Sequence, residues 1–437
     1  MSRLIPLRVN ARVILAWMAT CQLVLLVCTL VYLWIRVFYL GDLNAVAALS
    51  FPASEQPPVP LVPWRLGAHT FGDFLWPFEV ARVANPWTDD KMIPSNYPSA
   101  LITFFKLLTN FPYTLALGIF IVLAIASMIF PVAHSARRFD IKIITSAICL
   151  FVLLSFPFEM TIDRGNAQWL IVVPIYVFSI AWREGRWRLA AIGISIAAIF
   201  KLYPALLVVV LLVERRFKDA AIVIALTGAI TMFLFALYPG GIVATVRGFY
   251  DSLTRFSAPS FAEVTTNNYS AFGLLVNIAS MIPGSPSQLV PLLLAHPWVL
   301  GITYSLAVAA VVNARRLPFV VRLACAISLL SLSIPLSYGY SFAAIVVVVA
   351  ELLRTARFDV PDADIPLPLA ITLGIALTAT LAQWPYKTVT GNSIGTVIVP
   401  ATWIVLTGTA IVYRYGPTRR SAKRTDLAPD LIVHLRG

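Results

Sequence analysis

The feature that most constrains this chain is a series of apolar runs. Several of them reach the length of about 20 residues that a helix needs to cross a lipid bilayer. The runs are continuous rather than alternating, which favours helices over the strands of a closed barrel. Over its 437 residues the chain is 59% hydrophobic and only 12% charged. The sequence therefore predicts an all-α, polytopic membrane protein.

The apolar runs predict a series of membrane helices with short connections. Their expected positions are near residues 13–36, 112–134, 141–160, 167–182, 220–238, 291–312, 317–336, 339–353, 366–383 and 395–413. One further run, 189–213, has basic residues at both ends. Since basic loops face the cytoplasm, both of its ends are expected on that side. It is then a pair of short helices broken at Lys201–Pro204, because proline disfavours helix at the residue before it.

This count gives about twelve membrane helices with both termini in the cytoplasm. Residues 1–413 form one integral membrane domain of this kind, and 414–437 form a basic cytoplasmic tail. The net charge of +13 sits mostly in short loops between apolar runs, which argues against a nucleic-acid partner. The four cysteines lie in apolar runs without the spacing of a zinc or redox site. The first apolar run is also too long for a cleaved signal peptide.

The long loop 41–111 is predicted to lie outside, with interfacial helices of its own. It holds six of the 20 acidic residues of the chain. The functional site is therefore expected on the extracytoplasmic face of the plasma (inner) membrane, with membrane lipids around it. A second interfacial helix is expected to start after Pro98.

Asp73 in the stretch FGDFLWPFEVARVANPW is the main candidate for chemistry. It is predicted to cap a short amphipathic helix that runs to about Ala84, with Pro77 in the first turn. Two interpretations stand side by side. Asp73 is only a helix cap, or it is a general base for a hydroxyl nucleophile at the membrane surface. Glu79 and Arg82 are expected to pair along this helix.

Cofactor motifs are sparse in this sequence. There is no phosphate-binding glycine loop and no histidine cluster, so neither a nucleotide cofactor nor a zinc site is predicted. Asp89 and Asp90 permit a divalent cation without requiring one, and the alternative is a solvated turn. No cofactor is therefore expected beyond such a cation.

Two further basic residues and a set of aromatic side chains have two interpretations each. Lys201 is either a ligand-binding cation at membrane depth or a side chain that reaches from a half-helix to the interface. Arg164 either binds substrate or pairs with Asp163 or Glu159. Aromatic side chains such as Trp64, Trp87 and Tyr97 either stack on sugar rings or anchor the protein at the membrane surface.

Several short motifs occur in a recognisable order. Asp73 is followed by NPW and NYPSAL, then by DRGNAQWLI, KLYPALL with ERRFKD, and NNYSAFGLL. In that order the chain resembles polyprenyl-phosphate-sugar-dependent glycosyltransferases of the GT-C type, in particular glycosyltransferase family 87, over about residues 65–340. Asp73 matches the catalytic aspartate of that family. Other recurring positions fall on Asn166, Lys201, Pro204, Asn268 and Ser270.

The resemblance implies a GT-C-like fold and an inverting glycosyltransferase. A sugar, with mannose as the best guess, moves from a polyprenyl phosphate to an envelope glycolipid or glycan. Asp73 would be the base, while Lys201 or Arg164 would stabilise the departing phosphate. The implied substrate-binding residues are Lys201, Arg164, Asn166, Asn268, Ser270, Tyr97 and Tyr340.

The chain departs from the family late in its sequence. Where many relatives have a tryptophan and a histidine, it has IPLSYGYSF, with Tyr338 and Tyr340 but no histidine. Two other classes of protein therefore stay open. One is a transporter or flippase of lipid-linked sugars, although no second broken helix pair is found. The other is a non-enzymatic membrane subunit of an envelope assembly.

Overall fold

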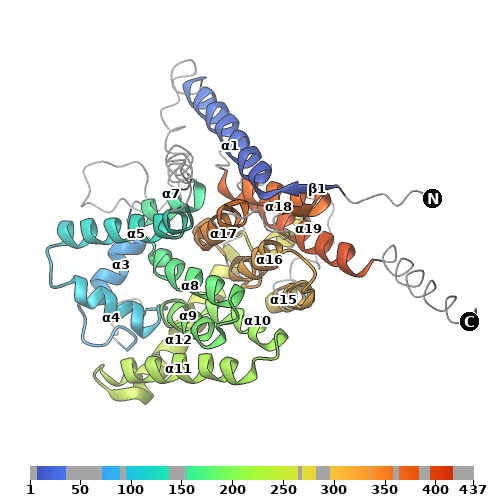
Figure 1. Ribbon diagram of the computed structural model, residues 1–437. Helices are drawn as coiled ribbons and strands as arrows, with labels where there is room; N and C mark the ends of the chain where they lie inside the picture. Colours follow the sequence, from blue (N-terminus) through green and yellow to red (C-terminus); the bar gives the residue numbers. More distant parts are fainter. Residues whose placement is uncertain are drawn as a thin grey trace, which may run out of the picture.

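The computed structural model is a bundle of helices (Figure 1). It describes residues 7–35, 71–88, 95–136, 152, 155–263, 268–281, 296–335, 337–357, 364–382 and 394–416. Apart from one small two-stranded sheet, the regular elements in these ranges are helical. The predicted all-α class is therefore confirmed. The tail after 416 and most of the run 141–160 lie outside the described residues.

The described residues of the first half of the chain form nine α-helices and two 3₁₀ helices. Their bounds are α1 Ala11–Trp34, α3 Gly72–Val80, α4 Ser99–Leu108, α5 Tyr113–Ala136, α7 Phe156–Arg164, η2 Ala167–Ile171, α8 Val172–Arg183, α9 Trp187–Phe200, η3 Tyr203–Leu207, α10 Val208–Val213 and α11 Phe217–Ala236. The expected interfacial helix after Pro98 is confirmed as α4, since Pro98 is its N-cap residue.

The second half adds helices that pack around the same core. Their bounds are α12 Gly241–Glu263, α13 Ala271–Met281, α15 Pro297–Asn313, α16 Phe319–Leu332, η4 Gly339–Ile345, α17 Val346–Arg357, α18 Leu367–Leu381 and α19 Gly395–Tyr415. Strand β1 (Arg8–Asn10) pairs antiparallel with β2 (Asp364–Pro366), with Val9 opposite Ile365. This pairing ties the start of α1 to the start of α18.

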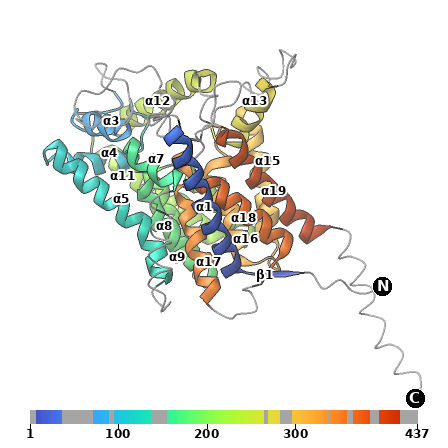
Figure 2. The same cartoon turned by 90° about the horizontal axis from the view of Figure 1, so that it is seen from above.

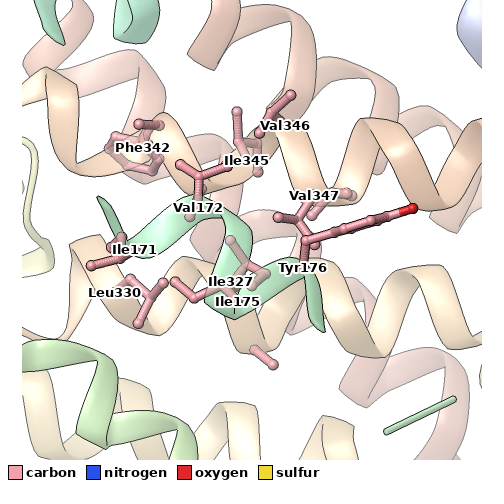
Figure 3. Close-up of a cluster of buried hydrophobic side chains, with 14 of the residues drawn as sticks. Ile171, Val172, Ile175, Tyr176, Ile327, Leu330, Phe342, Ile345, Val346 and Val347 are labelled. Carbon is pink, nitrogen blue, oxygen red and sulfur yellow. The ribbon is translucent and has the colours of Figure 1, made fainter. Parts of the chain in front are cut away.

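The core lies where α8, α16 and α17 meet. Figure 3 shows Val172 and Ile175 of α8 facing Ile327 of α16 and Val347 of α17. All four side chains are at most 3% exposed. Between the helices of a membrane protein such aliphatic groups stabilise the core through close van der Waals packing. This core therefore gives the short helices that carry the site a rigid base.

The surface of the long helices is apolar as well. Val122 of α5, Ile224 of α11 and Val412 of α19 are 64%, 69% and 68% exposed. These three helices are each long and apolar enough to cross a membrane. A soluble protein rarely exposes apolar surface of this extent, so these faces fit contact with lipid. The chain is an all-α membrane protein.

In the described ranges, fewer helices than the predicted twelve are long and apolar enough to cross a membrane. Within the described ranges three helices have the necessary length and composition, or four if α7 and the η2–α8 segment count as one span bent by 118°. Seven further apolar helices of 10–17 residues are too short to qualify. Many predicted spans do coincide with helices, but the count of twelve stays a prediction.

The two ends of the bundle differ in what they carry. In Figure 2, α3, α12 and α13 lie at one end, and β1 lies at the other beside the C-terminal part of α17. The second end is also fixed by Arg12, whose Nε donates to the carbonyl of Ala356 at 2.8 Å. We call these the α3 end and the β1 end.

The run 189–213 enters the bundle and returns, as predicted from its charges. The helical part breaks between Phe200 and Tyr203, and Lys201 has an extended backbone. The guanidinium of Arg216, just after α10, lies 5.0 Å from the ring centroid of Trp187, the first residue of α9. Both ends of this hairpin therefore meet at the same side of the bundle, and Lys201 is at its tip.

Candidate active site

Helix α3 is held against the turn between α7 and η2. The N–H of Phe71 donates to the carbonyl of Asp163 at 2.6 Å. Gly165 has a φ of +63°, and a Cβ at that position would lie 2.6 Å from the Cβ of Phe74. Only glycine allows this close approach without strain. The packing places the first turn of α3 directly beside Arg164 and Asn166.

The predicted cap role of Asp73 is wrong. The N-cap residue of α3 is Phe71, in the left-handed region at φ 58°, and Asp73 is the second residue of the helix. The helix ends at Val80 rather than near Ala84, so Pro77 lies in its interior and not in its first turn. The cap differs because the contact of Phe71 with Asp163 fixes where the helix starts. The Asp73 side chain is thereby released from capping the backbone.

The Asp73 carboxylate is bound by two side chains from the facing turn. Arg164 donates to Oδ1 at 2.8 Å and Asn166 donates to Oδ2 at 2.8 Å. The Asn166 side chain is fixed in turn, since its Oδ1 accepts the N–H of Gln168 and so caps η2. The side chains of Asp73 and Arg164 are 14% and 21% exposed. The carboxylate is therefore oriented and mostly desolvated but still accessible.

Arg164 forms an ion pair with Asp73 of another helix, 91 residues away in the sequence. The sequence offered only its neighbours Asp163 and Glu159 as partners. The Asp163 carboxylate is also close enough for its charge to interact with Arg164 and Asp73. Arg164 thus serves to hold the candidate base in place.

Tyr97 and Lys201 complete the group around Asp73. The Lys201 ammonium lies 4.9 Å from the centroid of the Tyr97 ring, a cation–π contact. Asp73 is near enough to Lys201 for their charges to interact. The ring of Tyr97 is oriented through its backbone, because its carbonyl accepts the indole N–H of Trp87 at 3.2 Å. The structure therefore brings together five of the predicted site residues: Asp73, Arg164, Asn166, Tyr97 and Lys201.

The site includes a second tyrosine, Tyr338, which the sequence singled out only as part of a divergent motif. Burial raises the pKa of Tyr338, and the nearby Asp73 carboxylate raises it further while Arg164 lowers it. The pKa of Tyr97 is also raised, first by burial and then by Asp73 and Tyr338, while Arg164 lowers it. Both phenols therefore stay protonated and neutral beside the carboxylate.

Asn268 and Ser270 bind the backbone just before Tyr338. Asn268 donates to the carbonyl of Pro335 at 2.7 Å and accepts the N–H of Ser337 at 3.0 Å. Ser270 donates to the same carbonyl at 3.0 Å and accepts the N–H of Gly273, which caps α13. Both side chains are at most 2% exposed. Their hydrogen bonds hold the segment that carries Tyr338, so we infer that they position the site.

Four predicted residues are not fully described. Trp64, Asp89 and Asp90 lie outside the described residues, as does the side chain of Tyr340, whose backbone belongs to η4. Within the described part of the chain, no group of three histidine, cysteine or acidic side chains is arranged to hold a metal ion. A divalent cation at Asp89 and Asp90, which the sequence permits without requiring, stays a hypothesis.

Two other predictions near α3 have clear outcomes. The pairing of Glu79 with Arg82 is confirmed, with nitrogen and oxygen 3.1 Å apart. For Trp87, both sugar stacking and membrane anchoring are wrong. It is 2% exposed, and its ring packs edge-on against Phe235 and Tyr238. The preceding Asn85 fixes this turn by donating to the carbonyl of Pro239 at 2.7 Å.

The motif order that suggested a family is matched by a comparison with known families. The profile of glycosyltransferase family 87 matches residues 96–335, more than half of the chain. The chain belongs to glycosyltransferase family 87. The match covers Tyr97, Arg164, Asn166, Lys201, Asn268 and Ser270, and it starts after Asp73. Comparisons with curated proteins and with solved structures gave no match.

Membership of this family makes the chain a membrane glycosyltransferase. The residues inside the matched region surround the Asp73 carboxylate, although Asp73 itself precedes that region. The cluster at the α3 end is therefore the candidate active site of this glycosyltransferase. Gln168 and Tyr203 also lie in this cluster, and sequence reasoning passed over them within the motifs DRGNAQWLI and KLYPALL.

Proposed function

We propose that this glycosyltransferase moves a sugar, with mannose as the first candidate, from a polyprenyl phosphate to a hydroxyl of an envelope glycolipid or glycan. The reaction inverts the anomeric centre and takes place on the extracytoplasmic face of the plasma membrane. The observation that carries this proposal is the Asp73 carboxylate. It is fixed by one bond to each oxygen and remains 14% exposed.

Asp73 is suited to act as the general base. A carboxylate has about four lone-pair positions on its two oxygens. Arg164 and Asn166 use one on each oxygen, so each oxygen keeps a position for an incoming O–H. The neutral phenols of Tyr97 and Tyr338 add hydrogen-bonding groups nearby without competing for the proton. Base assistance of this kind accelerates a reaction by about 10²–10⁴-fold.

The proposed step forms one bond and breaks one bond. The acceptor oxygen bonds to the anomeric carbon of the donor, and its proton passes to Asp73. The bond from the anomeric carbon to the phosphate oxygen breaks, and its electron pair leaves with the polyprenyl phosphate. Attack from the face opposite the phosphate inverts the anomeric centre. The donor is already activated, so the step needs no nucleotide.

Lys201 is the proposed partner of the departing phosphate. It sits at the tip of the α9–α10 hairpin beside Tyr97, and within the described ranges its ammonium makes no ion pair with a carboxylate. An ammonium placed where charge develops stabilises a leaving phosphate more strongly in a desolvated site than in water. Arg164 is committed to Asp73 and serves mainly to position the base.

The placement on the extracytoplasmic face rests on the charges of the β1 end. Arg216 and Trp187 meet there, and so do Arg183 and Glu351. The loops at that end are rich in arginine, which favours the cytoplasmic side. The α3 end, with Asp73 and the other site residues, would then face the opposite side. A lipid-linked donor would bring its phosphate to that level of the membrane.

The test compares wild-type protein with Asp73→Asn, both purified in nanodiscs. Radiolabelled polyprenyl-phosphate mannose and an envelope glycolipid extract are supplied, and the arabinofuranose donor is used in a parallel set. We expect wild type to form labelled product and Asp73→Asn to form about 10²–10⁴-fold less. Asparagine keeps the shape of the side chain but removes the charge that pairs with Arg164, so the melting temperature is measured as well and transfer is compared per folded, donor-binding molecule.

Two other results would count against the proposal. Equal transfer by both proteins would remove Asp73 from the mechanism. Labelled donor that crosses the bilayer unchanged, equally well with both proteins, would support a flippase instead. Addition of EDTA in the same assay tests whether transfer requires a divalent cation, since loss of transfer and rescue by Mg²⁺ would indicate a metal requirement.

A further inference from the structure

Two buried polar side chains beside the site are not used by the proposed reaction. They are Gln168 of η2 and Tyr203, the first residue of η3. Gln168 is 0% exposed. Its Oε1 and the hydroxyl of Tyr203 are buried atoms with no hydrogen-bond partner among the described residues. Buried polar atoms are nearly always paired in native proteins, so two together require an explanation.

Both side chains are attached to residues of the site. The N–H of Gln168 donates to Asn166, and Asn166 holds the Asp73 carboxylate. Tyr203 follows Lys201 by two residues at the tip of the hairpin. The Tyr203 hydroxyl and the Gln168 side-chain amide interact directly at close range, but neither Oε1 nor the hydroxyl meets the geometry of a hydrogen bond within the described residues. The two groups therefore flank one small polar region next to the base.

The remaining contact of Gln168 orients its amide. Its Nε2 points to the carbonyl of Ser341 at 3.5 Å, at the limit of a hydrogen bond. The amide oxygen of Gln168 therefore points away from Ser341. The indole N–H of Trp169 and the hydroxyl of Ser337 are also buried without a partner in the described part of the chain. They are neighbours in sequence of Gln168 and Tyr338, so unpaired polar atoms gather around this site.

The chemistry of the pair selects the kind of ligand. An amide oxygen only accepts a hydrogen bond, whereas a phenol both donates and accepts. A single alcohol hydroxyl satisfies both, by donating to Gln168 and accepting from Tyr203. Neither side chain carries a charge, so the pair offers nothing specific to a phosphate. The proposed partner of the phosphate is instead Lys201.

We propose that Gln168 and Tyr203 form a subsite that binds one sugar hydroxyl during transfer. This rests on the proposed function and adds to it the residues that select the sugar. The hydroxyl belongs to the transferred sugar or to the acceptor sugar. The subsite would make transfer sensitive to the loss of that one hydroxyl and tolerant of changes elsewhere.

The first measurement is the relative kcat/KM of wild type for polyprenyl-phosphate mannose and its 2-, 3-, 4- and 6-deoxy forms. A second arm keeps the natural donor and uses acceptor sugars that each lack one hydroxyl. We expect one deoxy substrate in one arm to react about 10- to 100-fold more slowly. The arm that contains it tells whether the hydroxyl is from the donor or the acceptor.

The second measurement repeats the panel with Tyr203→Phe and Gln168→Met. Each variant should lose the penalty for that one deoxy substrate while the ranking of the others is unchanged. Two control variants remove similar groups away from the site. Tyr304→Phe removes a hydroxyl that bonds Ser328 and Thr407, and Gln22→Met removes an amide that bonds the carbonyl of Thr378. Both controls should keep the wild-type profile.

The outcomes separate this inference from the proposed function. If wild type transfers sugar but no single deoxy substrate is penalised, the subsite is overturned without recourse to any variant. If the variants slow all substrates equally and keep the penalty, the two side chains have a structural role and the subsite is again overturned. If wild type transfers sugar from no donor, the proposed function itself fails.

Discussion

The two ends of the bundle use buried polar groups in opposite ways. At the β1 end, Glu214 pairs with Arg322 and, at 2.8 Å, with Arg315, while Arg183 pairs with Glu351. At the α3 end, Asp73 is paired, but Lys201 contacts a tyrosine ring and Gln168 and Tyr203 keep unpaired atoms. One end has matched its charges internally. The other end has polar atoms that can form hydrogen bonds to a ligand.

We call the first group the β1-end network, meaning Arg183, Glu184, Glu214, Arg315, Arg322, Glu351 and Arg354. The network links helices that are distant in the sequence. Glu214 follows α10, Arg322 belongs to α16, and Arg322 also lies 5.2 Å from the Trp182 ring centroid. The difference teaches that burial of charge alone does not mark a functional site. What distinguishes the α3 end is that several unsatisfied polar groups gather around one carboxylate, whereas Thr227, Thr378 and Arg414 each have one such atom on three different helices.

The largest effect on stability is expected from Arg322→Met. Among the described residues, it leaves Glu214, whose side chain is 7% exposed, with only the exposed Arg315 as an ion-pair partner. Breaking a buried ion pair from one side costs about 3–5 kcal/mol. The free energy of unfolding should fall by that order in a denaturation experiment, while donor affinity per folded molecule stays the same. The double variant Arg322→Met with Glu214→Met should recover part of the loss, and a lower donor affinity in either variant would contradict the comparison.

A smaller effect, on binding rather than stability, is expected from Lys201→Met. Loss of a charge-assisted contact to the donor phosphate costs about 1.5–3 kcal/mol, which weakens donor binding roughly 10- to 100-fold. Isothermal titration with a polyprenyl phosphate measures it. Lys106 is a matched control, since its ammonium lies 5.3 Å from the Tyr238 ring centroid but on an exposed face of α4. Equal weakening by Lys106→Met would mean that the phosphate is not bound at Lys201.

The smallest effect is expected from Arg82→Ala. Its pair with Glu79 is at the α3 end, but the two side chains are 49% and 41% exposed. Exposed pairs contribute less than about 1 kcal/mol, and added salt screens them. Melting temperature and transfer rate should both change little. A large loss of activity would show that the active site extends along α3 beyond Asp73. The α3 end would then hold more functional residues than the comparison assumes.

The sequence predicted the helices well where hydrophobic burial decides them. The run 112–134 corresponds to α5, Tyr113–Ala136, and the run 395–413 corresponds to α19, Gly395–Tyr415. Charge placement also predicted that residues 189–213 return to their starting side. Both signals are local along the chain. They depend on the period and the flanks of a run and not on what packs against it.

The rest of the site depends on contacts between distant segments. The start of α3 is fixed by Phe71 meeting Asp163, and Arg164 finds its partner on α3. Neither pairing leaves a trace in the spacing of one sequence. Trp87 was predicted at the surface because tryptophan is common in membrane interfaces, yet α11 and α12 cover it. The motif order nevertheless selected residues of the candidate site from both α7–η2 and the α9–α10 hairpin.

The α9–α10 hairpin has one more consequence. Both ends of the hairpin are held at the β1 end. The distance from there to Lys201 therefore depends on the length of α9, which at 14 residues spans about 21 Å. The length of α9 thus sets how far Lys201 lies from the β1 end. One residue inserted into α9 would raise the tip by about 1.5 Å and turn it by about 100°. Relatives with a longer or shorter α9 would present this cation at another height, and hence to a donor whose phosphate lies at another level of the membrane.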